Sequence, residues 1–355
     1  MLYVTVFAAL LLAGALTANN YPLRVTTYKL VLLLLFLFVA FRFEVGCDWM
    51  GYLAQYAAQR GVGFEGAWDR RDPLWWLAIE LIHRGELPYP WLNVLSAIVF
   101  FAGVHVLARQ QPDPLAFLIL LFPILILNVP MSGIRQATAL GFICFAFVDF
   151  KDRRLLRFIL WTVVAAGFHS SASIFLLLTP LVGGSYSRGR LILSGLLAVP
   201  GALLLASGNS GELALERYVD SGTDAYGAVY RTATLFLTGL FFFSLLHRSW
   251  IRLFPRDLKL ASVGALMMIA VFPLITISSV IADRLGYYFV PLQAMMFART
   301  PFLVAGPYAK LLSIAPYLGL MIILIVWTNS SRHFNVCYVP YQTWLFGYPT
   351  GMPYF

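Results

Sequence analysis

The sequence predicts an all-α membrane protein, a polytopic transmembrane helical bundle of about twelve spans. Two observations support this prediction. The chain of 355 residues is 60% hydrophobic and only 12% charged, and its mean hydropathy of +0.79 lies far above that of an ordinary soluble domain. Apolar runs of near-spanning length also recur between short polar loops. We expect residues 1–355 to form a single integral membrane domain.

Each predicted span needs about 20 apolar residues. The spans begin near Tyr3, Tyr28, Pro90, Pro114, Gly133, Leu155, Ser171, Arg190, Val229, Leu258, Arg284 and Tyr308. The first lacks the basic flank of a signal peptide, which favours a retained span. The stretch from Leu155 to Leu181 could instead be one long kinked helix, and Pro291 interrupts the span that follows Arg284.

Alternate loops are basic, and this pattern predicts how the chain is oriented. Arginine and lysine gather in one set of loops, whereas most acidic residues lie in the other set. Cytoplasmic loops of membrane proteins carry the basic excess. We therefore expect both termini and the loops 43–89 and 207–229 at the outer face. The net charge of +9 then reflects topology and not nucleic-acid binding, which would need a clustered basic soluble face.

The longer outer loop, residues 43–89, contains a predicted short amphipathic helix. Asp72 is a typical N-cap residue and Pro73 suits the first helical position. A tryptophan-rich apolar segment follows that is too short to cross a bilayer. Such a segment is typical of an interfacial or re-entrant helix.

Arg135 indicates an anion site, because it stands at the head of an apolar helix that continues to Phe147. An arginine there is costly unless it meets an anion or a polar cavity. Helix N-terminal N–H groups also favour an anion, and the guanidinium fork suits phosphate oxygens. Gln136 adds an amide beside it, and we expect Arg42 and Gln136 to support substrate binding by Arg135. Arg284, at another predicted outer end, could hold a diphosphate together with Arg135.

Candidate bases lie at the same predicted face. Histidine has an ordinary pKa near 6.5, which makes His169 a candidate general base, and Asp48 is the competing candidate. His169 could instead be a hydrogen-bonded structural residue at a helix break. Arg42 with Asp48, or Asp283 beside Arg284, could likewise be ion pairs that anchor loops.

Aromatic residues near this face suit stacking on sugars, although an aromatic belt would place most of them there as well. Tyr287 and Tyr52 are the candidates that we assign to substrate. The three cysteines have no CxxC or Cys/His metal spacing. We therefore predict no metal site and no cofactor.

These motifs, taken in order, resemble the EpsG-like branch of the Wzy-type polysaccharide polymerases. The matching residues are Arg42, 45–49, Tyr52, 72–74, 132–137, 168–172, 283–284, Tyr287 and 339–341. The resemblance implies an inverting glycosyltransferase that transfers a growing glycan from undecaprenyl diphosphate to the nonreducing end of an incoming lipid-linked repeat unit. It also implies a periplasm-facing active site in the cell inner membrane and, as possible partners, a chain-length regulator and a flippase.

The chain departs from the family pattern at Cys47 and Trp49, where a hydroxyl residue and a tyrosine are usual. Cys47 and Cys337 would both lie outside, where a disulfide could form. Two other functions stay open. One is an O-antigen ligase, which uses a similar donor but a lipid A acceptor. The other is a non-enzymatic transporter of the lipid-linked oligosaccharide, which would be expected to show internal repeats.

Overall fold

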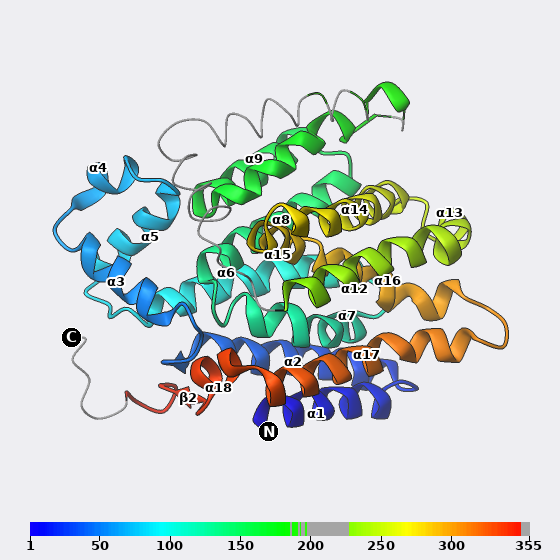
Figure 1. Ribbon diagram of the computed structural model, residues 1–355, viewed down its shortest axis with the longest axis horizontal. Coiled ribbons are helices and arrows are strands. Elements are labelled where there is room, and N and C mark those ends of the chain that lie inside the picture. Colours follow the sequence, from blue (N-terminus) through cyan, green and yellow to red (C-terminus); the bar gives the residue numbers. More distant parts are fainter. Residues whose placement is uncertain (185–186, 191, 193–195, 197–226, 349–355) are drawn as a thin grey trace. The chain divides into compact units, whose positions relative to one another are not determined.

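The computed structural model describes residues 1–184, 187–190, 192, 196 and 227–348. They belong to two compact units. The first comprises Met1–Phe142, Val164–Ser170 and Ile314–Phe355, and the second comprises Ile143–Val163 and Ser171–Ser313. Both units are built almost entirely from helices, as the apolar composition predicts (Figure 1). The predicted loop 207–229 and the span predicted to begin near Arg190 fall largely outside the described residues.

The first unit contains the N-terminal and C-terminal helices. They are α1 (Leu2–Leu16), α2 (Tyr21–Ala40), α3 (Trp49–Gln59), α4 (Gly63–Trp68), α5 (Pro73–Arg84), α6 (Trp91–Ala108), α7 (Pro114–Leu121) with the π-helical turn Phe122–Ile126, most of α17 (Ala309–Ser330), and α18 (Arg332–Tyr338). α2 packs on α6 and α7, and α7 packs on α1. α3, α4 and α5 form a group in which α5 packs on α3, α4 and α6 (Figure 1).

In the second unit, several helices pack against the helix that begins at Ala228. The elements of this unit are α12 (Ala228–Phe241), the π-helical turn Phe242–Leu246, α13 (His247–Leu253), α14 (Leu258–Val271), the 3-10 helices Ser170–Leu181 and Phe272–Thr276, α15 (Ser279–Tyr287) and α16 (Val290–Leu303). α12 packs on α14, α15 and α16. α8 (Ile134–Lys151) and α9 (Leu155–Phe168) contribute residues to both units.

Several helices have the length and apolar composition of membrane spans, and the chain is an all-α, multi-pass membrane protein. In the described part of the chain, five helical segments qualify: Tyr21–Ala40, Trp91–Ala108, Ala228–Leu253, Leu258–Thr276 and Ala309–Ser330. Four shorter apolar helices are Leu2–Leu16, Pro114–Ile126, Leu155–Phe168 and Ser170–Leu181. The total of about twelve spans stays a prediction.

Two predicted helix boundaries can be compared directly with the structure. α9 ends at Phe168 and a 3-10 helix begins at Ser170, so the stretch from Leu155 to Leu181 is two helices and not one. The interruption predicted after Arg284 is present, since α15 ends at Tyr287 and α16 begins at Val290, just before Pro291. Pro291 lies in the first turn of α16, where a missing N–H is tolerated because that turn has no intrahelical acceptor.

A short two-stranded sheet and a disulfide close the loop 43–89 of the first unit onto the C-terminal segment. β1 (Arg42–Phe43) pairs antiparallel with β2 (Gln342–Thr343), and a disulfide joins Cys47 to Cys337 with their Cα atoms 4.8 Å apart. The Gly46 N–H donates to the Cys337 carbonyl at 2.7 Å. The disulfide that the sequence left open is therefore present, and such bonds persist in oxidising compartments.

Candidate functional site

Arg135 lies in the first turn of α8 and pairs with a carboxylate from a distant part of the first unit. Its Nη1 is 3.1 Å from Oδ2 of Asp72, and the other Asp72 oxygen accepts the Ser170 N–H at 2.8 Å. One carboxylate thus joins the start of α8, the start of α5 and the break after α9. The Asp72 side chain is 5% exposed and that of Arg135 is 24% exposed. In the described part of the chain, the buried Nε of Arg135 has no hydrogen-bond partner.

Asp72 occupies the predicted N-cap position of α5, with Pro73 in the first turn. Its side chain nevertheless makes no capping bond, because its backbone adopts the left-handed conformation at φ 60 and ψ 57. The carboxylate faces Arg135 and Ser170 instead. Burial raises the pKa of Asp72 above its ordinary value, and the charge of Arg135 and the Ser170 N–H oppose that rise without overcoming it.

Arg71 adds a second guanidinium at the same place. Its Nε and Nη2 lie 3.2 and 2.9 Å from Oγ of Ser170. Sequence reasoning missed Arg71, because it belongs to a loop whose fold was unknown. The only available signal was its position directly before Asp72 and Pro73. Two arginines therefore approach the Asp72–Ser170 contact, which makes this region suited to an anion.

Asp48 directly precedes α3, and its carboxylate lies beside the turn that precedes α8. Its Oδ2 accepts a hydrogen bond from Ser132 Oγ at 3.2 Å, and a Cβ placed on Gly133 would lie 3.9 Å from that carboxylate oxygen. Asp48 is exposed. Because Ser132 stands three residues before Arg135, the carboxylate is close to the head of the helix that carries the arginine.

Arg42 is enclosed by the turns that carry these residues. It is 2% exposed. The Arg42 Nε donates to the carbonyls of Val45 and Met131, both at 3.0 Å. Nη1 donates to the Val39 carbonyl and Nη2 to Asn93 Oδ1, each at 2.8 Å. These contacts fasten the loop that leads to Asp48 to the turn that leads to Arg135. The observed geometry is that of a positioning residue.

His169 is the single residue between α9 and the following 3-10 helix. The backbone N–H of His169 donates to the Ala165 carbonyl at 2.9 Å, and the residue is largely buried. Its neighbour Ser170 is held by Asp72 and Arg71. The structure therefore brings both candidate bases, His169 and Asp48, into the first unit with Arg135. Gln136 is buried in the first turn of α8.

The aromatic candidate Tyr52 belongs to the packing between α3 and α5. Its ring packs edge-on against Trp75 with centroids 5.3 Å apart, and it is 7% exposed. The indole N–H of Trp75 donates to Gln55 Oε1 at 2.9 Å. Trp75, predicted at a membrane interface, is thus buried in protein because its ring and its N–H both find partners on α3.

Arg284 and Tyr287 lie in the last turn of α15, in the second unit. Asp283 beside them forms an ion pair, as one interpretation of the sequence allowed, but its partner is Arg231. The two groups share hydrogen bonds of 2.7 and 2.9 Å. The Arg231 guanidinium also lies 5.6 Å from the centre of the Tyr287 ring. Arg231 was not foreseen, since nothing in the sequence near Asp283 points to α12.

Comparison with known proteins adds one positive finding. A family model described as the EpsG family matches residues 25–343, a range that includes every residue of the candidate site. No curated protein and no solved structure matches the chain.

Proposed function

The chain belongs to the EpsG family, and from this we propose that it is a polysaccharide polymerase of the cell inner membrane. In this proposal it is an inverting glycosyltransferase. It transfers a growing glycan from undecaprenyl diphosphate to the nonreducing-end sugar of an incoming lipid-linked repeat unit, at a site that faces the periplasm. The observation that carries the proposal is Arg135, a partly exposed guanidinium at the head of α8 that Asp72 contacts through one nitrogen.

Arg135 and Arg71 would bind the departing diphosphate. As the bond between the sugar and the diphosphate oxygen breaks, negative charge grows on that oxygen, and nearby cations stabilise it. The α8 N-terminus contributes further N–H dipoles. Asp72 contacts the Arg135 guanidinium through one nitrogen, and the Arg135 side chain stays 24% exposed. Asp72 therefore acts as a positioning residue in this proposal.

The acceptor sugar must lose its hydroxyl proton as the new glycosidic bond forms. His169 or Asp48 would take that proton, and the diphosphate would leave from the opposite face of the donor sugar, which inverts its configuration. His169 directly precedes Ser170, which donates to the Asp72 carboxylate, and Asp48 accepts from Ser132, three residues before Arg135. Arg42 and Gln136 would support this arrangement from buried positions. Assignment of Arg284, Tyr287 and Tyr52 to substrate stays a prediction.

The test is elongation of lipid-linked repeat units by the purified protein in detergent. Arg135→Ala should fold normally and lose about a hundredfold or more of the rate, leaving single-repeat glycans in cells. Arg60→Ala, a change at an exposed arginine at the end of α3, is the matched control. Normal long chains from Arg135→Ala would refute the assigned role.

Two further outcomes separate the competing functions. Loss of a polymerase leaves one repeat on lipid A, whereas loss of a ligase leaves none. Elongation in detergent, without a bilayer, would argue against a transporter. His169→Ala with retained elongation would move the general base to Asp48.

A further inference from the structure

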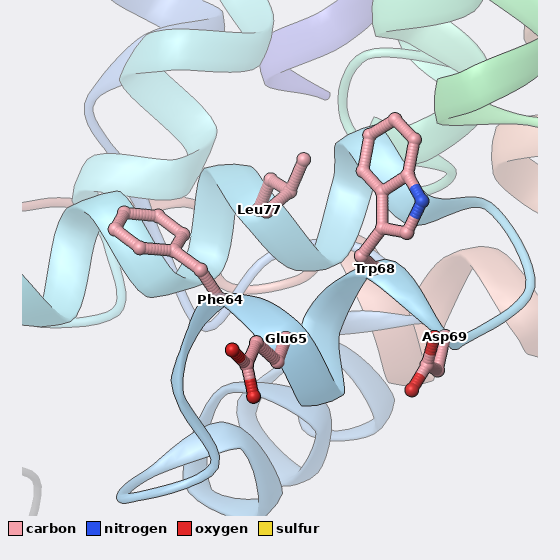
Figure 2. Close-up of a pocket in the computed structure, with 5 residues that line it drawn as sticks. All are labelled: Phe64, Glu65, Trp68, Asp69 and Leu77. Carbon is pink, nitrogen blue, oxygen red and sulfur yellow. The ribbon is translucent and has the colours of Figure 1, made fainter.

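An open pocket of about 550 Å³ lies on the hairpin formed by α4 and α5, away from the contacts of Arg135. Phe64, Glu65, Trp68, Asp69 and Leu77 line it. Figure 2 shows the rings of Phe64 and Trp68 on either side of Leu77. The carboxylate of Glu65 lies on α4, and that of Asp69 lies at the C-terminal end of this helix. Nothing in the proposed reaction uses these residues.

The lining combines one open aromatic face with hydrogen-bond acceptors. Trp68 is 60% exposed although it is a large apolar residue. The Phe64 ring is backed by the Arg84 guanidinium, 4.0 Å from its centre. Within the described residues, neither Glu65 nor Asp69 forms an ion pair. The pocket thus presents an indole face and carboxylate oxygens that are available to donors.

We propose that this pocket binds sugar residues of the glycan carried by the lipid diphosphate. The C–H face of a pyranose ring is apolar and suits an indole face, whereas the hydroxyl groups around its edge donate well to carboxylates. An anion would be repelled by Glu65 and Asp69. The sugars recognised here are therefore neutral sugars or amino sugars and not uronic acids.

The hairpin connects the pocket physically to the candidate active site. Asp69 lines the pocket, and Asp72, three residues later, contacts Arg135. Three residues of chain span at most about 11 Å. A diphosphate at Arg135 and a sugar at Trp68 can therefore belong to the same oligosaccharide. This assignment rests on the proposed function, because it takes the ligand to be the donor glycan.

Binding is measured with the free repeat-unit oligosaccharide, which lacks the diphosphate, by calorimetry on the purified full-length protein. Trp68→Ala should weaken binding by roughly tenfold or more, and Glu65→Gln with Asp69→Asn should weaken it by about tenfold. Leu81→Ala, an exposed apolar change on α5 outside the pocket, should bind normally. An oligosaccharide made of uronic acids should bind much more weakly than a neutral one.

Chain length provides the second measurement. In the elongation assay, Trp68→Ala should still join two repeats but should release shorter products, since the donor glycan is held less firmly. Suppose that the wild type elongates normally and that Trp68→Ala keeps full glycan affinity and full product length. That result overturns the pocket assignment alone. Suppose instead that glycan binding depends on Trp68 but that the wild type elongates no substrate. That result overturns the proposed polymerase function and supports the sugar pocket.

An alternative is that α4 and Trp68 anchor the protein in the membrane, and a spin label on α4 distinguishes this role from sugar binding. The cysteines of the described chain are paired or buried, so Glu65→Cys introduces one accessible thiol for a spin label. In nanodiscs we expect that label to be reached by a water-soluble relaxation agent. Preferential contact with dissolved oxygen in the bilayer would overturn the proposal.

Discussion

Asp72→Asn should slow elongation about tenfold and leave the protein folded. The amide keeps the shape of the carboxylate, and its oxygen can still accept the Ser170 N–H. The contact with Arg135 is lost, because the amide has only one acceptor oxygen and turns its NH2 group, a donor, toward the guanidinium. A hydrogen bond to a charged group contributes about 1.5–3 kcal/mol. We take the lower end because Arg135 is 24% exposed to water, and about 1.4 kcal/mol corresponds to a factor of ten.

The pH dependence of stability gives an independent readout of the same substitution. Burial raises the pKa of Asp72 in the folded protein, so the folded state binds this proton more tightly than the unfolded state does. The contribution of Asp72 to the free energy of unfolding is therefore largest below the unfolded pKa, near 4. It falls as the pH rises through the raised folded pKa. Asp72→Asn should remove this fall.

Both effects can be measured on purified protein in detergent. Elongation is followed with a lipid-linked repeat unit, and thermal unfolding is followed across the acidic pH range. Glu86→Gln, which neutralises an exposed carboxylate after α5, is the matched control and should change neither. A wild-type elongation rate together with an unchanged pH profile in Asp72→Asn would refute the role that we assign to this contact.

Three other substitutions test how the site is held. Cys47→Ser removes the bond to Cys337 and should lower the free energy of unfolding by about 2–5 kcal/mol; an unchanged melting temperature would show that the disulfide adds no stability. Arg42→Met leaves several buried carbonyls unpaired and should cost about 3 kcal/mol or more in denaturant unfolding, so wild-type stability would contradict its positioning role. Gly103→Ala puts a Cβ 2.0 Å from the Gly141 carbonyl oxygen and should reduce the yield of folded protein, because the backbones must separate; normal yield and melting would disprove this close crossing.

The amino-acid sequence carried the membrane class and much of the local structure. Apolar runs must be buried or placed in lipid, so composition alone predicted helices such as α2, α6 and α17. Asp72 and Pro73 marked the start of α5 correctly because capping and proline preferences act over a few residues. The basic loops, by contrast, give an orientation that stays a prediction.

The partners of the charged residues were decided by tertiary structure. The sequence marked Arg135 as a residue that needs an anion, yet its carboxylate partner is 63 positions away in the chain. Asp72 looked like a helix cap and instead became that partner, since its left-handed backbone turns the side chain away from α5. Arg42, which could have paired with Asp48, is instead enclosed by backbone carbonyls. Periodicity and composition report local burial, whereas ion pairs depend on which distant segments the packed helices bring together.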